Sequence, residues 1–536
     1  MRRIALALCA AAVAAAPVAA HAQTTASSWR RGGTCYEVFI RSFADSNGDG
    51  IGDINGLISK LDYINDGNPA SQRDLGASCI WLMPVAQSPS YHGYDVSDYY
   101  TVESDYGTND DFKRLIAEAH RRGIRVLVDM VLNHASSEHP YFQEALRDPN
   151  SPHRNWFRFS PTVVGKGPWG AEAWHKNPHR DEYYYGVFWQ GMPDLNYDTP
   201  EVLEEAKRVA TFWLREMGVD GFRLDAVPYL VEEGTVLAAT PGTHRVLREY
   251  GAHVRAINSN SYTVGEVWDS VGAMLPYYPD QLDSYFAFEL ADALINAVNR
   301  GSVSRMFDGY MRLQRTMPQD RWSPFLRNHD QTRTLTDLGG DRAKARVAVT
   351  LLLTLPGLPF LYYGEEIGMV GNKRNGDEDL RTPMQWTRAG GFTTGTPWRA
   401  PQGDWATVNV ESQETDPASL LNLHRRLVHL RAANRAIASG ELAPLAAMSP
   451  QVAAYIRKDA SRPVLVIANL GATPVSGVAL SALDGTLRPG RYSARGLLEP
   501  AGAARLHVAS TGRFTGYVPV PTLAPHQVHV LQLVKE

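Results

Sequence analysis

Short apolar runs alternate with amphipathic segments over most of the chain. A run such as RVLVDMVLN at 125–133 is rich in β-branched and aliphatic residues and has polar residues at both ends, which is typical of a buried strand. Segment 110–123, DDFKRLIAEAHRRG, instead repeats apolar residues at helical spacing and ends in glycine. The pattern predicts eight strands, at 36–43, 78–84, 125–133, 221–227, 262–268, 283–290, 322–328 and 358–364.

Helical segments fill the gaps between these strands. Thr199 and Pro200, for example, are favourable first residues for a helix that runs on to Gly218. Strands that alternate with helices form βα units around a parallel sheet. Eight such units predict an α/β protein with a (β/α)8 TIM barrel.

Two parts of the chain depart from this alternation. From His134 to about Tyr197 the chain is rich in Trp, Tyr, Pro and His, and a structureless loop of that length is uncommon, so we expect a small inserted domain after strand three. Beyond about residue 440, strands such as PVLVIANL are separated by Gly/Pro turns without helices, which favours a C-terminal antiparallel β-sandwich. The predicted division is 1–22 signal peptide, 30–134 and 198–438 catalytic barrel, 135–197 inserted domain B and 439–536 C-terminal domain.

The N-terminus has the composition of an export signal. Two arginines precede an apolar, alanine-rich stretch from Ile4 to Ala20, and Ala20-His21-Ala22 matches a signal-peptidase site. We expect cleavage after Ala22 and a secreted or periplasmic protein with no membrane attachment once the signal is removed; the alternative is an N-terminal membrane anchor. A net charge of −4 and a pI near 6.5 give no indication of a nucleic-acid partner.

Export leaves two cysteines, Cys35 and Cys79, in the mature chain. In an oxidising compartment they can pair as a disulfide, or they can remain as two buried free thiols. The sequence leaves both readings open.

Charged and polar residues gather where the predicted strands end. Catalytic groups of a TIM barrel lie at the carboxyl ends of its strands. Here these positions hold Asp129, Asn133, His134, Arg223, Asp225, Glu266, Asn328, His329 and Asp330.

Arg223 and Asp225 stand two residues apart in one strand, so both side chains point to the same side. A guanidinium keeps a nearby aspartate ionised, and an ionised carboxylate is the nucleophile that glycosidic substitution requires. Glu266, from the next strand, is placed to donate a proton to the leaving oxygen. The alternative for the pair alone is a structural ion pair that closes the barrel.

Five stretches together resemble the α-amylase superfamily, glycoside hydrolase family 13. They stand in the family's order and extend over the whole barrel. Within that superfamily, MPDLN is similar to secreted bacterial α-amylases of the group intermediate between oligo-1,6-glucosidases and neopullulanases. The stretches are DMVLNH (129–134), MPDLN (192–196), GFRLDAVPY (221–229), VGEVWD (264–269) and FLRNHD (325–330).

The resemblance implies a role for each matching residue. Asp225 would be the nucleophile of a retaining reaction through a covalent glycosyl-enzyme, Glu266 the acid/base, and Asp330 a stabiliser of the transition state that grips sugar hydroxyls. Tyr94 matches a ring that stacks on the sugar beside the cleaved bond. The other implied substrate-binding residues are His92, Asp95, His134, Arg223 and His329.

The stretch DSNGDGIGD at 45–53 offers oxygen ligands at alternate positions, with Gly50 for a sharp turn, which suits Ca²⁺. Gly56 stands where an EF-hand has its bidentate Glu, so a free-standing EF-hand is not expected. The resemblance implies a structural Ca²⁺ on this loop and adds a backbone carbonyl as a ligand; it also makes Asn133 a candidate for a second site. The expected ligands are Asp45, Asn47, Asp49, Ile51 and Asp53, and the alternative is a polar turn without metal.

Three specificities remain open within the resemblance. They are an endo-acting α-amylase on starch, an exo-acting α-glucosidase or oligo-1,6-glucosidase, and a trehalose synthase-like maltose isomerase. Pro228-Tyr229 stands where many amylases have Lys-His, and Asp95 is a residue that exo-glucosidases also use. Because polymeric starch lies outside cells, the export signal favours a monomeric secreted α-amylase acting on starch and maltooligosaccharides. A non-catalytic carbohydrate-binding protein is a remote alternative, since such proteins typically lose one of the three acidic groups that are present here.

Overall fold

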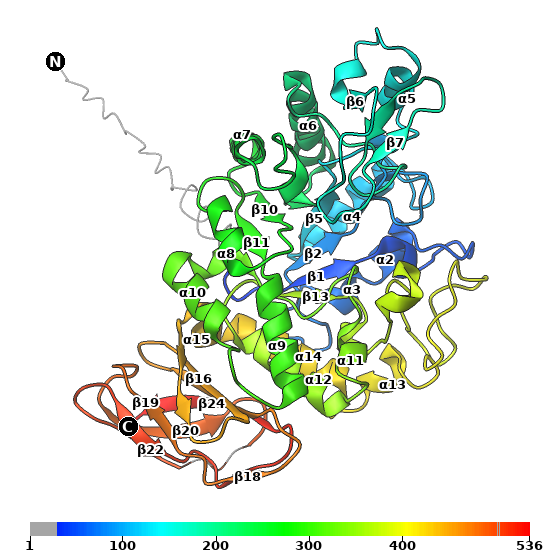
Figure 1. The fold of residues 1–536 in the computed structure, drawn as a ribbon. Helices are drawn as coiled ribbons and strands as arrows, with labels where there is room; N and C mark the ends of the chain where they lie inside the picture. Colours follow the sequence, from blue (N-terminus) through cyan, green and yellow to red (C-terminus); the bar gives the residue numbers. More distant parts are fainter. Residues whose placement is uncertain (1–28, 501, 503) are drawn as a thin grey trace, which may run out of the picture.

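The computed structural model describes residues 29–500, 502 and 504–536 (Figure 1). The predicted signal peptide, 1–22, lies outside the described residues. Within the described part, no helix combines the length and the apolar character needed to span a bilayer.

Eight parallel strands form the central barrel in chain order, as the alternation predicts (Figure 1). The two ends of the sheet are joined by backbone hydrogen bonds, from the Leu358 amide to the Trp322 carbonyl (3.1 Å) and from the Phe360 amide to the Pro324 carbonyl (2.9 Å). The barrel is therefore nearly closed. Its strands are β1 (Cys35–Val38), β2 (Cys79–Leu82), β5 (Arg125–Met130), β9 (Gly221–Leu224), β10 (Tyr262–Gly265), β11 (Ser284–Phe286), β12 (Trp322–Ser323) and β13 (Phe360–Tyr362).

Amphipathic helices pack around the outside of the barrel. In the helix at 109–121 one face is polar, and Phe112, Leu115 and Ile116 on the other face are buried. A capping box between Thr108 and Asp111 fixes where that helix begins. The helices that follow the strands are α2 (Ile54–Ser59), α3 (Leu61–Ile64), α4 (Asn109–Arg121), α6 (Pro200–Phe212), α7 (Pro241–Ile257), α8 (Val271–Met274), α9 (Phe288–Arg300), α10 (Asp308–Thr316), α12 (Arg342–Thr354) and α14 (Leu420–Ala433).

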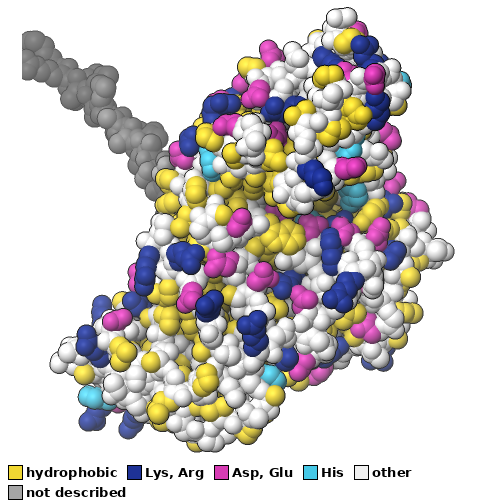
Figure 2. Space-filling model, in the orientation of Figure 1, with side chains coloured by type: hydrophobic (Ala, Val, Ile, Leu, Met, Phe, Trp, Pro, Cys, Tyr) yellow, Lys and Arg dark blue, Asp and Glu magenta, His cyan; other side chains and the backbone are white. Residues whose placement is uncertain are grey.

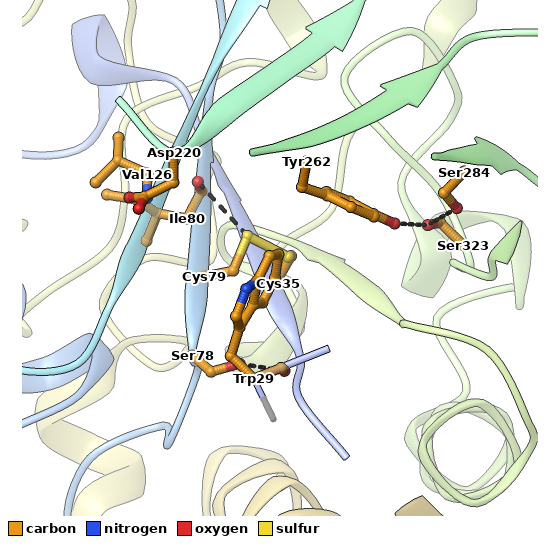
Figure 3. Close-up of a disulfide and its surroundings, with 10 residues drawn as sticks. All are labelled: Trp29, Cys35, Ser78, Cys79, Ile80, Val126, Asp220, Tyr262, Ser284 and Ser323. Carbon is orange, nitrogen blue, oxygen red and sulfur yellow. Dashed lines mark hydrogen bonds between the residues drawn. A yellow bond between two sulfur atoms is a disulfide. The ribbon is translucent and has the colours of Figure 1, made fainter. Parts of the chain in front are cut away.

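Cys35 and Cys79 are bonded to each other at the amino-terminal end of the barrel (Figure 3). Cys35 and Cys79 are register partners on β1 and β2, with Cα atoms 4.3 Å apart, and both are fully buried. Trp29 packs edge-on against Tyr262, and its carbonyl accepts a hydrogen bond from Ser78. The structure therefore resolves the open alternative in favour of the disulfide, which lies inside the barrel.

The segment between β5 and α6 is a folded insertion (Figure 1). It has a three-stranded antiparallel sheet and a small core of its own, which includes Phe142, Leu146 and Tyr184. This insertion rises beside the carboxyl ends of the barrel strands. Its elements are α5 (Pro140–Arg147), β6 (Phe159–Ser160), β7 (Trp174–Lys176) and β8 (Tyr183–Tyr185).

The C-terminal region consists of antiparallel sheets, as predicted. A six-stranded sheet faces a three-stranded one across a separate hydrophobic core that includes Ile467, Leu480 and Leu531. At the junction with the barrel, the buried Arg457 donates to the carbonyls of Thr354 and Gly440. The strands of the two sheets are β14 (Leu442–Pro444), β15 (Ala446–Ala447), β16 (Val452–Arg457), β17 (Val464–Asn469), β19 (Leu480–Ala482), β20 (Gly490–Gly496), β21 (Leu506–Val508), β22 (Phe514–Tyr517) and β24 (Val528–Lys535).

Candidate active site

Asp225 and Glu266 stand side by side at the carboxyl ends of β9 and β10. Leu224 and Gly265, the last residues of these strands, are register partners in the parallel pair. The two acidic residues take the next position on each strand, so they lie at the same edge of the barrel. Both side chains line one cavity of about 920 Å³.

Arg223 lies beneath these two carboxylates and binds both of them. One of its terminal nitrogens is 2.6 Å from Asp225 Oδ1 and 2.9 Å from Asp129 Oδ1, and the other is 3.0 Å from Glu266 Oε1. Arg223 is only 1% exposed, so water does not screen these pairs. The predicted same-side placement of Arg223 and Asp225 is therefore present, and the guanidinium forms the floor of the site.

Glu266 has the protonation behaviour of a general acid. Burial raises the pKa of its carboxyl to about 7; the Arg223 guanidinium opposes this increase, and the charges of Asp225 and Asp330 add to it. The Ala226 amide donates to Glu266 Oε2 at 3.0 Å and fixes the orientation of the carboxyl group. Ala226 itself has a φ of 46°, a costly conformation for alanine, which places backbone strain directly beside the nucleophile.

Asp330 is held ionised from two sides. His329 Nε2 lies 3.1 Å from one carboxylate oxygen, and Arg381 donates to the other at 2.8 Å. Burial alone would raise the pKa of Asp330, but His329 and Arg381 lower it far below its ordinary value. An ionised Asp330 and a protonated Glu266 therefore coexist in one cavity near neutral pH.

His329 connects the cavity to the barrel interior. Its Nδ1 lies 2.5 Å from Glu37 Oε1, and its Nε2 lies 2.6 Å from the Tyr94 hydroxyl. Burial opposes the charged form, but Asp330 and Glu37 raise the pKa of His329 to about 9. The imidazole is thus a cation at neutral pH, and its two N–H groups are donors.

Contacts with His329 and Asp129 hold the Tyr94 side chain in place. Its ring stacks on His329 at an interplanar angle of 12°, and its hydroxyl donates to Asp129 at 3.0 Å. His134 and His92 complete this side of the cavity, and burial lowers the pKa of both histidines. The cavity is therefore lined by neutral imidazoles on this side.

Three of the predicted substrate-binding residues do not line the cavity. Arg223 and His329 lie behind the lining side chains and act through them. Asp95 is 4% exposed, and its carboxylate accepts hydrogen bonds from the Ser88 and Ser90 hydroxyls instead of facing the cavity. Both serines bind Asp95 Oδ1, and Asp95 stands next to the lining residues His92 and Tyr94 without lining this cavity itself.

Sequence reasoning missed most of the cavity wall. Glu37 is a single acidic residue in an apolar strand, and that isolated charge was an available signal. Part of the aromatic wall comes from the Trp-rich insertion (Trp169, Phe188 and Trp189), and Tyr229 and Trp268 come from the segments that follow β9 and β10. The lining residues that had not been predicted are Trp169, Phe188, Trp189, Met192, Ala226, Pro228, Tyr229, Trp268, Lys373, Asp377 and Arg381.

The side-chain oxygens of the 45–53 loop are possible metal ligands, but they also accept hydrogen bonds from the backbone of the same loop. Asp45 accepts from the amides of Asn47, Gly48 and Gly50, and Asp49 accepts from the Ile51 amide. Partial burial raises the pKa of Asp45, but hydrogen bonds led by Thr393 lower it overall, so the carboxylate is ionised. The donor chemistry fits Ca²⁺.

Asp53 instead caps α2 by accepting from the Gly56 amide. No three His, Cys, Asp or Glu side chains converge as a metal cluster within residues 29–500, 502 and 504–536. At the second candidate position, Asn133 Oδ1 and Asp194 Oδ2 are buried without a hydrogen-bond partner in the described structure. These two atoms are suitable oxygen ligands for a cation.

Comparison with known proteins agrees with this geometry. The family model described as "Alpha amylase, catalytic domain" matches residues 37–440. Alpha-amylase 3 of Dictyoglomus thermophilum is 38% identical over 449 residues, 82% of this chain and 85% of that protein. Trehalose synthase/amylase TreS of Mycolicibacterium smegmatis is 37% identical over 503 residues, 82% of each chain. The crystal structure of alpha-amylase from H. orenii has a TM-score of 0.82 at 38% identity and covers 94% of this chain and 100% of that one.

Proposed function

Because the chain belongs to the α-amylase family of glycoside hydrolases, we propose that it is a secreted α-amylase. It would cleave internal α-1,4-glucosidic bonds of starch and maltooligosaccharides with retention of configuration. The observation that carries this proposal is the pair of carboxyl groups at one cavity, Asp225 beside a buried guanidinium and Glu266 with a pKa of about 7. A retaining glycosidase requires one ionised and one protonated carboxyl group on either side of the scissile bond.

The first half-reaction uses both groups at once. Asp225 attacks the anomeric carbon while Glu266 gives its proton to the glycosidic oxygen. The bond from C1 to that oxygen breaks, an ester bond from C1 to Asp225 forms, and the shortened glucan leaves with the proton. The proton on Glu266 and the ion pair between Arg223 and Asp225 (2.6 Å) supply the two protonation states that this step needs.

The second half-reaction reverses the roles. Glu266, now ionised, takes a proton from water as the water oxygen attacks C1. The ester to Asp225 breaks, and the product regains its original anomeric configuration after two inversions. Ionised Glu266 is stabilised at this stage by Arg223, 3.0 Å away, and by the Ala226 amide.

The remaining cavity residues orient the sugar at the reacting centre. Asp330 offers an ionised acceptor for two sugar hydroxyls, and Tyr94 offers a ring face to the sugar. His92 and His134 are half-buried or buried neutral imidazoles that can donate or accept one hydrogen bond each.

The export signal supports placement outside the cytoplasm, where polymeric starch is available. The intramolecular disulfide is consistent with an oxidising compartment. We propose a monomer that is secreted or periplasmic after cleavage following Ala22. Mass spectrometry of the protein recovered from the medium and from the periplasm tests both the cleavage site and the location.

A structural Ca²⁺ is part of the proposal. The ligands would come from Asp45, Asn47, Asp49, Asp53 and the Ile51 carbonyl, and a second ion would take Asn133 and Asp194. A bound cation would offset repulsion among these oxygens and stabilise the loop. Melting in EGTA, with and without added Ca²⁺, tests this: the same melting temperature after prolonged chelation would argue against either site.

The decisive experiment uses a maltoheptaoside whose non-reducing end is chemically blocked. An exo-acting enzyme needs that end free, whereas an endo-acting one does not. Release of mid-length fragments supports the α-amylase; no cleavage, with maltose or isomaltose still split, supports an exo-glucosidase. The buried Asp95 is an argument against the second outcome, because that side chain does not wall off the cavity.

Maltose isomerisation is the second candidate, favoured by the similarity to the trehalose synthase/amylase. Incubation with maltose separates the two: accumulation of trehalose without net hydrolysis would identify an isomerase. Glu266→Gln tests whether this cavity is catalytic at all. If the variant hydrolyses starch at the wild-type rate, the cavity binds carbohydrate without catalysing its hydrolysis.

A further inference from the structure

Another cavity, of about 210 Å³, lies between the insertion and the barrel. Its wall consists of the first residues of α5, the adjoining residues of α6, β4 (Asp98–Val102) and the segment that follows β5, and we call it the insertion cavity. Figure 2 shows hydrophobic side chains among charged ones on the lobe that the insertion forms. Because protein interiors seldom leave so much space unfilled, the insertion cavity is a candidate ligand site.

The insertion cavity is separate from the catalytic cavity. The two have no lining residue in common. They border the same short segment, since Leu132 and Ala135 line the insertion cavity and His134 lines the catalytic one. A molecule in the insertion cavity therefore contacts neither Asp225 nor Glu266.

The wall of the insertion cavity is mainly apolar, although several tyrosines belong to it. The Tyr99 and Tyr197 hydroxyls donate to backbone carbonyls of the segment that follows β5, at 2.8 and 2.6 Å. The Tyr100 hydroxyl donates to Glu205 at 2.8 Å. With their hydroxyls bonded in this way, these residues offer mainly their rings to the cavity, and aliphatic side chains such as Val202 complete the wall. Flat apolar molecules pack well against such a surface.

His139 adds a hydrogen-bond donor to this apolar wall. Its Nδ1 accepts from the Tyr141 amide at 3.2 Å, so the proton of the neutral imidazole is on Nε2. Burial lowers the pKa of His139 to about 4, against the opposing charges of Asp98 and Glu205, and the ring is neutral at pH 7. Nε2 is not bonded to another group in the described part of the chain, which leaves its N–H for an acceptor on a ligand.

The charges around the insertion cavity favour a neutral ligand. Two carboxylates, Asp98 and Glu205, belong to the described lining, and no Lys or Arg does. An anion would meet these carboxylates without a counter-charge. A cation is not required either, because Glu205 already pairs with Arg208 at 2.8 Å and Asp98 accepts from the Thr101 hydroxyl at 2.6 Å.

We propose that the insertion cavity binds a small neutral aromatic molecule that carries one hydrogen-bond acceptor. An apolar cavity of about 150 Å³ holds benzene, so 210 Å³ has room for a ring with a short substituent. The ring packs against Tyr99 and Tyr197, and the acceptor receives the Nε2 proton of His139. The site goes beyond the proposed function, because its occupation needs no step of the glycosidic reaction.

Fluorine NMR of 4-fluoroacetophenone added to the protein measures this binding. Its carbonyl oxygen is the acceptor, and titration should give a dissociation constant of roughly 0.1–1 mM, as expected for about ten non-hydrogen atoms. 4-Fluorobenzoate, which has a similar shape and a negative charge, should bind roughly ten-fold more weakly or worse. 1-Ethyl-4-fluorobenzene has no acceptor and should bind about three- to ten-fold more weakly, because the His139 N–H then has no partner.

Substitutions of Ala206 locate the bound molecule. Ala206 lies on α6 in the wall of the insertion cavity, so a larger side chain at this position occupies part of the space. Ala206→Phe should weaken the binding of 4-fluoroacetophenone by roughly ten-fold or more, and Ala206→Leu by about three-fold. Both variants should hydrolyse starch at the wild-type rate, which shows that they fold; if Ala206→Phe does not fold, Ala206→Leu decides. Trp268→Ala removes an exposed ring of the catalytic cavity, serves as the matched control and should leave the dissociation constant unchanged.

The results that would overturn the proposal are distinct. A fluorine signal that stays unchanged up to the solubility limit of 4-fluoroacetophenone would mean that the cavity does not bind this class of molecule. Wild-type affinity in both folded Ala206 variants, or weaker binding in Trp268→Ala alone, would place the molecule outside the insertion cavity. Equal or tighter binding of 4-fluorobenzoate or 1-ethyl-4-fluorobenzene would contradict the ligand class. Absence of starch hydrolysis by the wild type would instead contradict the proposed function and leave the binding result standing.

Discussion

Glu266→Gln should stabilise the protein at neutral and alkaline pH while abolishing catalysis. Burial raises the pKa of Glu266 from 4.5 to about 7, which makes its ionisation unfavourable in the folded state. Gln keeps an oxygen that can accept from Arg223 and the Ala226 amide but carries no charge. The substitution therefore removes the cost of holding this carboxylate in the cavity.

The pKa difference sets the sign and size of this effect. Because the folded pKa is raised, the wild-type contribution to stability is fully present below pH 4.5 and is lost as pH rises through 7. Between pH 5 and pH 8 the wild type should lose roughly 2–3 kcal/mol of stability that the variant keeps. The advantage of Glu266→Gln should thus be small at pH 5 and about 3 kcal/mol at pH 8.

Guanidinium unfolding at both pH values measures this difference directly. Calcium and salt are held constant, and Glu172→Gln provides the same chemical change at an exposed site in the insertion. A stability difference between Glu266→Gln and wild type that is the same at pH 5 and pH 8 would refute the assignment of Glu266 as the proton-holding group.

Three further substitutions follow from buried contacts. Arg223 pairs with Asp129, Asp225 and Glu266, whereas a lysine can pair with only one carboxylate. Arg223→Lys should therefore lower kcat/KM on maltoheptaose by roughly 100-fold. Full activity would show that catalysis does not need the three ion pairs. Arg457→Met removes the donor to the Thr354 and Gly440 carbonyls and should lower the free energy of unfolding by about 2–4 kcal/mol. Limited proteolysis should then cleave the variant at the junction between the barrel and the C-terminal region, where wild type should stay intact. Replacing Cys35 and Cys79 together by Ala opens a loop of sequence separation 44 and should lower the free energy of unfolding by about 4 kcal/mol; a change below 1 kcal/mol would contradict this.

The barrel could be predicted because its signals are local. Each strand is a short apolar run, and the helices carry caps and amphipathic faces, as in α4 with its Thr108–Asp111 capping box. The two carboxylates could be predicted for a related reason. The carboxyl ends of parallel strands lie at one edge of the barrel, so Asp225 and Glu266, at the ends of consecutive strands, are expected to be neighbours.

The rest of the site depends on contacts between distant segments. Arg381 reaches Asp330 from 51 residues away, and Glu37 reaches His329 across 292 residues. No pattern in the sequence indicates that Ser88 and Ser90 bind the Asp95 carboxylate. The disulfide also could not be decided, since only the strand register places Cys35 beside Cys79.

The central claim is that Asp225 is the nucleophile of a retaining reaction. A slow fluorinated substrate, 5-fluoro-α-maltosyl fluoride, forms the glycosyl-enzyme faster than water removes it, so peptide mass spectrometry can locate the bound sugar. We predict the added mass on the peptide that contains GFRLDAVPY (221–229), at Asp225, and its absence in Asp225→Asn. A label on another carboxylate, or normal turnover by Asp225→Asn, would contradict the mechanism.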